Sequence, residues 1–250
     1  TEDPVPYAQA LADNPYAGAW SSGGDLNTGR RMLNTAAGSG ADSGLISGGY
    51  TGSDTAAVEQ YNGTAWTEKS DLNAARRTMS TTGTVTAAIT AGGGPPNSDL
   101  TETWNGSSWT EVNELNTARQ NGTVVGTTTA ALFAAGYSTV QATNVESWNG
   151  SSWTETTDVN TGRSELASSG TSTAGLAASG TSTLALAFGG GIPPEVTKTE
   201  SWDGTSWTEV ADLAVARRLL AGGGTATSAL ASGGFPAPLQ ANTEEWTFSG

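Results

Sequence analysis

The chain contains no cysteine and no histidine, and only 10 of its 250 residues are Lys or Arg. These absences exclude disulfides, thiol catalysis, histidine acid/base chemistry and zinc sites of the usual Cys/His type. No apolar run approaches the ~18 residues of a membrane span, so we expect no membrane insertion. The net charge of −14 leaves little basic surface for a phosphate backbone, so we expect no nucleic-acid partner.

Small residues and tryptophan are abundant. The chain has 34 Gly and nine Trp, although hydrophobic residues make up only 36% of it. Disordered segments are poor in aromatic residues, which argues against disorder. A Gly- and Thr-rich chain with regularly placed Trp is typical of a β protein with many tight turns.

One sixteen-residue phrase, "WNGSSWTEVNELNTAR" at 104–119, recurs through the chain. Related copies occupy 61–76, 148–163 and 202–217, with a half copy at 19–30 and the complementary half at 244–250. The second aromatic position of the phrase is Trp20, Trp66, Trp109, Trp153 and Trp207. A Glu lies two residues before the first aromatic in every copy: Glu59, Glu102, Glu146, Glu200 and Glu244. An Arg closes each phrase: Arg30, Arg76, Arg119, Arg163 and Arg217.

Successive repeats are 46, 43, 44 and 54 residues apart, measured between the second Trp positions. A period of about 40–50 residues fits one blade of a β-propeller. Each repeat divides into four short strand candidates separated by turn signals, with Asn-Gly or Asp-Gly predicting a two-residue hairpin between the third and fourth strands. Such a turn would make the two aromatic residues diagonal neighbours on one face of the ribbon.

The sequence therefore predicts an all-β, five-bladed propeller over residues 18–250, with four antiparallel strands per blade. The chain begins with a fourth strand and ends with a third, so pairing of the two would close the ring and cover its edges. About ten extra residues predict an extended hairpin between the first and second strands of one blade, around residues 164–188. Residues 1–17 are expected to form a tether that packs along the ring or against another copy of the chain.

The repeat resembles the kelch repeat. It shares the Gly pair after the second strand, the aromatic on the third strand, the Trp about five residues later, and the Arg that opens the next repeat. The phrasing "WNGSSWTE…LNTAR" with "GT.TAAL..GG" is most similar to Gly/Thr-rich kelch-like repeats in virion and tail-fibre proteins of marine bacteriophages. That resemblance implies a non-enzymatic module on a virion surface or tail appendage, with another virion protein or a host-surface glycan as partner.

Two other functions remain open at this stage: a glycan-active enzyme that uses carboxylates alone, and an intracellular kelch-type interaction scaffold. Kelch-like copper oxidases need a Cys–Tyr cofactor and His ligands, and the chain has neither Cys nor His. The segment "SWDGTSW" at 201–207 only partly matches the sialidase Asp box. No cofactor is expected; calcium is an open alternative because acidic residues are frequent, although no EF-hand loop is present.

Residues used five times around a ring are expected to build it, so the recurring arginines are assigned a structural role. We expect each to anchor a blade-to-blade loop through backbone carbonyls or the acid five residues before it. Binding is expected instead in the loops between the second and third strands, which differ between repeats. The candidate binding residues are Tyr50, Asp54, Asn97, Tyr137, Ile192 and Phe235; the alternative is that the aromatic members only cap the glycine steps.

Overall fold

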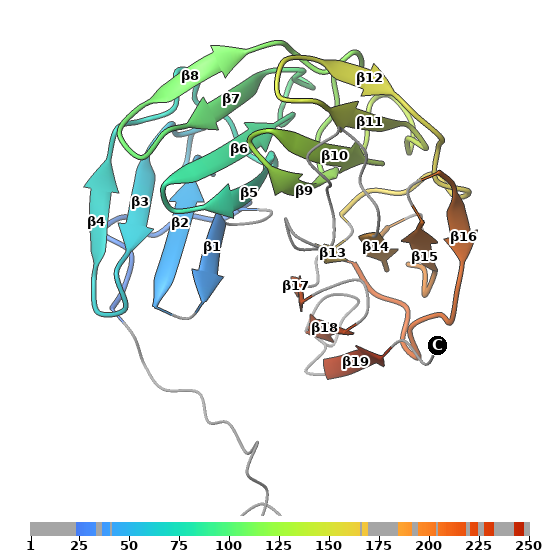
Figure 1. Ribbon diagram of the computed structural model, residues 1–250. Coiled ribbons are helices and arrows are strands. Elements are labelled where there is room, and N and C mark those ends of the chain that lie inside the picture. Colours follow the sequence, from blue (N-terminus) through green and yellow to red (C-terminus); the bar gives the residue numbers. More distant parts are fainter. Residues whose placement is uncertain are drawn as a thin grey trace, which may run out of the picture.

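The computed structural model describes residues 24–33, 37–40, 42–165, 167–169, 185–191, 195–203, 205–218, 221–224, 228–232 and 243–247. These residues form five antiparallel sheets, four with four strands and one with three. They contain no helix, and hence none long and apolar enough to cross a membrane. The prediction of an all-β fold is confirmed. Figure 1 shows the sheets around a common centre, with the first strand of each sheet innermost.

The strands follow one another in sequence order within each sheet. The first sheet contains β1 (Ala37–Gly40), β2 (Ser43–Ser47), β3 (Val58–Tyr61) and β4 (Trp66–Lys69). The second contains β5 (Ser80–Thr84), β6 (Ala87–Ala91), β7 (Thr101–Trp104) and β8 (Trp109–Val112). The third contains β9 (Thr123–Thr127), β10 (Ala130–Ala134), β11 (Val145–Trp148) and β12 (Trp153–Glu155).

The fourth sheet contains β13 (Ala167–Ser169), β14 (Ala185–Phe188), β15 (Thr199–Trp202) and β16 (Trp207–Glu209). The fifth contains β17 (Ala221–Gly224), β18 (Ser228–Ser232) and β19 (Thr243–Thr247). Strands β13 and β14 pair antiparallel, and residues 170–184 between them, where the extended hairpin was predicted, lie outside the described residues. The predicted tether at 1–17 and the segment around Trp20 that was predicted to close the ring also lie outside them.

The hairpin between the third and fourth strands differs from the predicted two-residue turn. Trp104 is paired directly with Trp109, so the loop has four residues. The reason is the side chain of Asn105, whose Oδ1 accepts hydrogen bonds from the backbone N–H groups of Ser107 and Ser108 at 2.9 and 3.0 Å. This Asx-type turn places the two indoles opposite each other, with ring centroids 5.4 Å apart.

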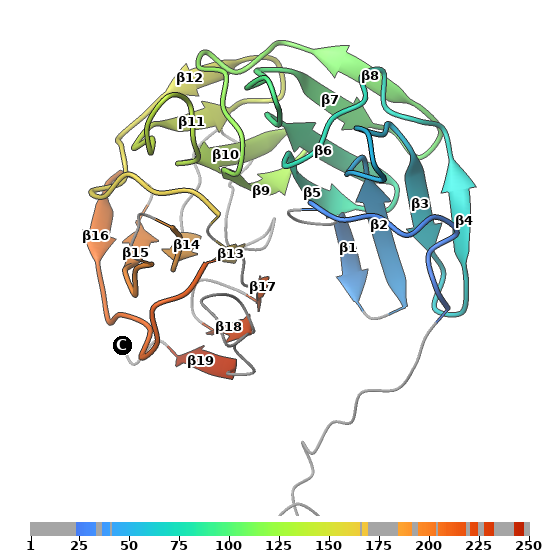
Figure 2. The same ribbon diagram turned by 180° about the vertical axis from the view of Figure 1, so that it is seen from behind.

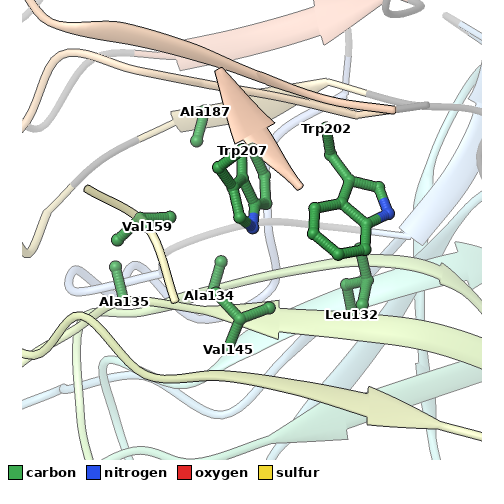
Figure 3. Close-up of a cluster of buried hydrophobic side chains, with 8 residues drawn as sticks. All are labelled: Leu132, Ala134, Ala135, Val145, Val159, Ala187, Trp202 and Trp207. Carbon is green, nitrogen blue, oxygen red and sulfur yellow. The ribbon is translucent and has the colours of Figure 1, made fainter. Parts of the chain in front are cut away.

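Each described pair of Trp residues packs against the sheet that precedes it. Trp202 and Trp207 of the fourth sheet are buried against Leu132 and Val145 of the third, as Figure 3 shows. Trp148 and Trp153 are buried in the same way against the second sheet, and Trp104 and Trp109 against the first. The repeated aromatic residues therefore form the apolar contacts between neighbouring sheets, where burial of large aromatic surfaces contributes most.

The second strands of the second and third sheets, β6 and β10, are buried on both faces. In β10, Leu132 packs toward the fourth sheet, whereas Phe133 packs toward the second. This alternation follows from the two-residue period of a strand. It explains why the second strand of each repeat is a short, continuous apolar segment and not an alternating one.

The second glycine of the Gly pair leaves no room for a side chain. Gly93 has φ +117°, and a Cβ there would lie 2.9 Å from the carbonyl oxygen of Arg77. Gly52 has nearly the same φ, +119°, but a Cβ there would meet nothing within 4 Å. Substitution of Gly52 therefore adds backbone strain alone, whereas substitution of Gly93 adds the same strain and a steric clash.

We predict that Gly93→Ala destabilises the protein by about 1–3 kcal/mol more than Gly52→Ala, because both variants strain the backbone but only Gly93→Ala also introduces a clash. Urea unfolding of the two variants measures the difference. Equal losses would show that the close approach of the linker that carries Arg77 is unimportant at this position.

Candidate functional site: the linkers and the variable loops

The linkers between sheets carry the repeated polar residues. Figure 2 shows residues 24–33, in blue, crossing the first sheet from its outer edge toward the centre. The next linker does the same at the second sheet: Asn73 bonds the carbonyl of Trp109 on β8, and Arg76 bonds the carbonyl of Gly92 at the end of β6. Each linker therefore lies along one end of the sheet that follows it.

The recurring arginine of each linker forms an ion pair with the recurring glutamate on the third strand of that sheet. Arg119 Nη1 lies 2.7 Å from Glu146 Oε1, and both side chains are 0% exposed. The other pairs are Arg30–Glu59 at 3.0 Å, Arg76–Glu102 at 2.5 Å, Arg163–Glu200, and Arg217–Glu244 at 2.9 Å. The repeat thus builds five ion pairs in equivalent positions, of which four are almost fully buried.

The second oxygen of each glutamate is also satisfied. Glu146 Oε2 accepts hydrogen bonds from the backbone N–H and the side-chain Nδ2 of Asn116, at 2.7 and 2.8 Å. The same Nδ2 donates to the carbonyl of Trp153 at 3.2 Å. The arrangement repeats with Asn27, Asn73 and Asn160; in the last linker Ala214 supplies only its backbone N–H.

The arginines connect two sheets at once. The carbonyl of Arg119 accepts a hydrogen bond from Gly93 of the preceding sheet at 3.0 Å. Its Nη2 donates to the carbonyl of Phe133 in the following sheet at 3.3 Å, and the guanidinium lies 4.8 Å from the Phe133 ring centroid. Burial lowers the pKa of Arg119, and the charge of Glu146 opposes that shift. The guanidinium of an arginine stays protonated in proteins, so Arg119 and Glu146 form a charged pair.

The predicted partner of these arginines was half correct. The recurring arginines from Arg76 to Arg217 bond backbone carbonyls, as predicted. The carboxylate partner of each is the recurring glutamate on the third strand, and not the acid five residues before the arginine. The sequence signal was present, because that glutamate recurs in every copy. The linker asparagine that bonds this glutamate also recurs in four copies, and its role was not predicted.

The carboxylates of this network are committed to structure. Paired and hydrogen-bonded on both oxygens, Glu102, Glu146 and Glu200 have no free position from which to act on a substrate. In the part of the chain that the structure describes, no group of three or more acidic residues could hold a metal ion. The repeated residues are therefore poor candidates for catalysis.

The variable loops follow the second strand of each sheet. Of the predicted binding residues, Tyr50, Asp54, Asn97 and Tyr137 are described, whereas Ile192 and Phe235 lie outside the described residues. Backbone bridges join Arg31 to Tyr50 and Gln120 to Tyr137. Each of these two loops therefore lies beside the residue that follows a recurring linker arginine. The loops are thus held at the same end of the sheets as the linkers.

Asp54 and Asn97 connect neighbouring loops. Arg77 Nη1 lies 3.2 Å from Asp54 Oδ1, and the backbone of Arg77 is bridged to Gly94 in the next loop. Asn97 Nδ2 donates to the carbonyl of Ser138 in the loop after that. These two polar residues therefore fix the loops against one another, and the aromatic residues beside them remain the better candidates for contact with a ligand.

Among the described residues, three large hydrophobic side chains are exposed, and all three lie at this end of the sheets. Tyr137 and Val140, in one loop, are 37% and 66% exposed, and Met32 in the first linker is 43% exposed. Tyr50 is half-buried, with the guanidinium carbons of Arg77 and Arg31 4.5 and 5.2 Å from its ring centroid. The variable loops thus present apolar, aromatic and cationic groups on a rigid frame.

Comparison with known proteins gives no assignment. A scan against protein-family models finds no match for the chain. A search of curated proteins finds no relative either. The function must therefore be argued from the fold and from the two groups of residues described above.

Proposed function

We propose that the chain is a non-enzymatic, five-bladed β-propeller that serves as a binding module on a virion surface or tail appendage. Its partners would be another virion protein or a host-surface glycan, contacted through the variable loops. The observation that carries the proposal is that the repeated polar side chains are used in contacts within and between the sheets, whereas the exposed Tyr137 and the half-buried Tyr50 lie in loops that the repeats do not share.

Closure of the ring is part of this proposal. Tyr61 and Trp66 of the first sheet stack with centroids 5.1 Å apart, like the other aromatic pairs, yet both are only half-buried among the described residues. The equivalent Trp104 and Trp109 are 2% and 6% exposed because a preceding sheet covers them. In a closed ring the fifth sheet precedes the first and would cover Tyr61 and Trp66, with the segment around Trp20 as its fourth strand.

Binding is favoured over catalysis by the state of the carboxylates. A carboxylate-only glycosidase needs two acidic groups that converge on open space a few ångströms apart. The buried acids described above are instead held by Arg and Asn, and the acid of the first variable loop, Asp54, is paired with Arg77. Exposed aromatic and polar loop residues on a rigid scaffold suit recognition.

The virion location rests on the resemblance of the repeat to kelch-like repeats of phage particles, and the acidic net charge of −14 suits an exposed surface. Immunogold electron microscopy of particles from the source lysate tests it. We expect label on the capsid surface or tail, together with binding of the purified chain to host cells. Label confined to the interior of uninfected cells, or turnover of a host glycan, would contradict the proposal.

A further inference from the structure

We propose that Arg31 and Tyr50 form an anion-binding site that recognises a sugar bearing a carboxylate or sulfate group. The inference rests on the proposed binding function and names the ligand class of one variable loop. It starts from the ion pairs: of the eight arginines, seven lie within ion-pair distance of a carboxylate in the described residues, and Arg31 does not.

Among the described residues Arg31 has no carboxylate within ion-pair distance, and the repeat offers a reason. Two arginines in the equivalent position pair with an acid in the variable loop of the preceding sheet: Arg77 with Asp54, and Arg218 with Glu195. For Arg31 the preceding sheet in a closed ring is the fifth. Its sequence from 219 to 243 contains no Asp or Glu, so the repeat supplies no carboxylate for Arg31.

The geometry leaves the guanidinium available to a ligand. Arg31 is exposed and its guanidinium carbon lies over the ring of Tyr50, 5.2 Å from the centroid. Stacking on an aromatic ring uses the face of the guanidinium and leaves the N–H groups at its edge free. Those edge donors match the oxygens of a carboxylate or sulfate in a two-pronged hydrogen bond.

The surroundings favour a sugar over an acidic peptide. Thr51 and Ser53, next to Tyr50, are exposed and carry hydroxyl groups that can bond sugar hydroxyls, and Met32 is an exposed apolar neighbour of Arg31. A densely acidic partner would be repelled by the net charge of −14, whereas a glycan with one acid per several hydroxyl-rich rings would not. The second cation at this ring, Arg77, is already paired with Asp54, so a single arginine remains for the acid of a ligand, which fits sparse charge.

The test is calorimetric titration of the full chain with four probes: a galactan oligosaccharide that carries a single galacturonate, the same oligosaccharide with a single sulfate in its place, the neutral galactan oligosaccharide and a polyglutamate peptide. We expect one or both acidic sugars to bind more tightly than the neutral sugar and the peptide. The two acidic probes separate carboxylate from sulfate recognition.

The variants separate a built site from general charge. Arg31→Gln should weaken acidic-sugar binding about ten-fold, and Arg31→Lys should restore only part of it, because lysine lacks the planar fork. Arg218→Gln removes the same charge at the equivalent position, from an arginine already held by Glu165 and Glu195, and should change affinity less than about two-fold.

Three results would overturn the inference: equal losses in Arg31→Gln and Arg218→Gln, full affinity in Arg31→Lys, or polyglutamate binding as tightly as the acidic sugars. Failure here is distinguishable from failure of the proposed function. Binding to host cells that survives in Arg31→Gln would leave the function standing without this site. Absence of the protein from the particle would remove the proposed function whatever the titrations show.

Discussion

Glu146→Ala is expected to destabilise the protein by about 3–5 kcal/mol, because it leaves the fully buried guanidinium of Arg119 without its counter-charge. The variant also removes the acceptor of two hydrogen bonds from Asn116. For a chain of this size the melting temperature should fall by roughly 6–20 °C. Thermal and urea unfolding measure the loss.

A double variant distinguishes the destabilisation caused by an unpaired buried charge from the net stabilisation that the Arg119–Glu146 pair provides. Arg119→Met with Glu146→Leu replaces both partners by apolar groups of similar size, and should recover a large part of the lost stability. Arg218→Gln, at a half-exposed pair on the same face, should cost far less. If Glu146→Ala melted like the parent chain while losing affinity for a ligand, the network would be a binding site and not a framework.

The hairpins show how far local sequence chemistry predicts structure. Asn-Gly at 105–106 correctly placed a turn between the third and fourth strands. It predicted the wrong loop length, because the side chain of Asn105 replaces a backbone acceptor and stabilises a four-residue turn. Turn propensity reports which residues tolerate a turn, whereas the register depends on side-chain hydrogen bonds that form only when the strands meet.

The ion pairs were missed for a different reason. The residues themselves recur in register, but the separation between partners does not: 26 residues for Arg76–Glu102, 27 for Arg119–Glu146 and 37 for Arg163–Glu200. Loops of unequal length lie between the partners, and in the fourth sheet residues 170–184 separate β13 from β14. A nearby acid at constant spacing was the simpler choice from sequence, and only the arrangement of strands brings the distant glutamate to the linker.

The sequence predicted which loops lie at the candidate binding face, but it did not predict which side chains contact one another there. Alternating strand direction correctly places the second-to-third-strand loops beside the linkers. It does not reveal that Asp54 and Asn97 join neighbouring loops, or that Arg31 alone lacks a carboxylate among the described residues. Those facts depend on which side chains meet across sheets.

Truncation of the chain tests whether the ring is closed. Removal of residues 1–17 should change the melting temperature little, because this segment is expected to lie outside the ring. Removal of residues 1–23 also deletes Trp20 and the proposed fourth strand of the fifth sheet. In a closed ring Trp20 would be buried and its loss would cost about 3–5 kcal/mol, and the truncation would also expose the edge of β19 (Thr243–Thr247).

The melting temperatures of these two truncated chains, measured side by side, test the closed five-bladed ring most directly. A closed ring predicts that the chain lacking residues 1–23 melts roughly 6–20 °C below the chain lacking residues 1–17. Identical melting of the two chains would contradict closure by the N-terminal strand.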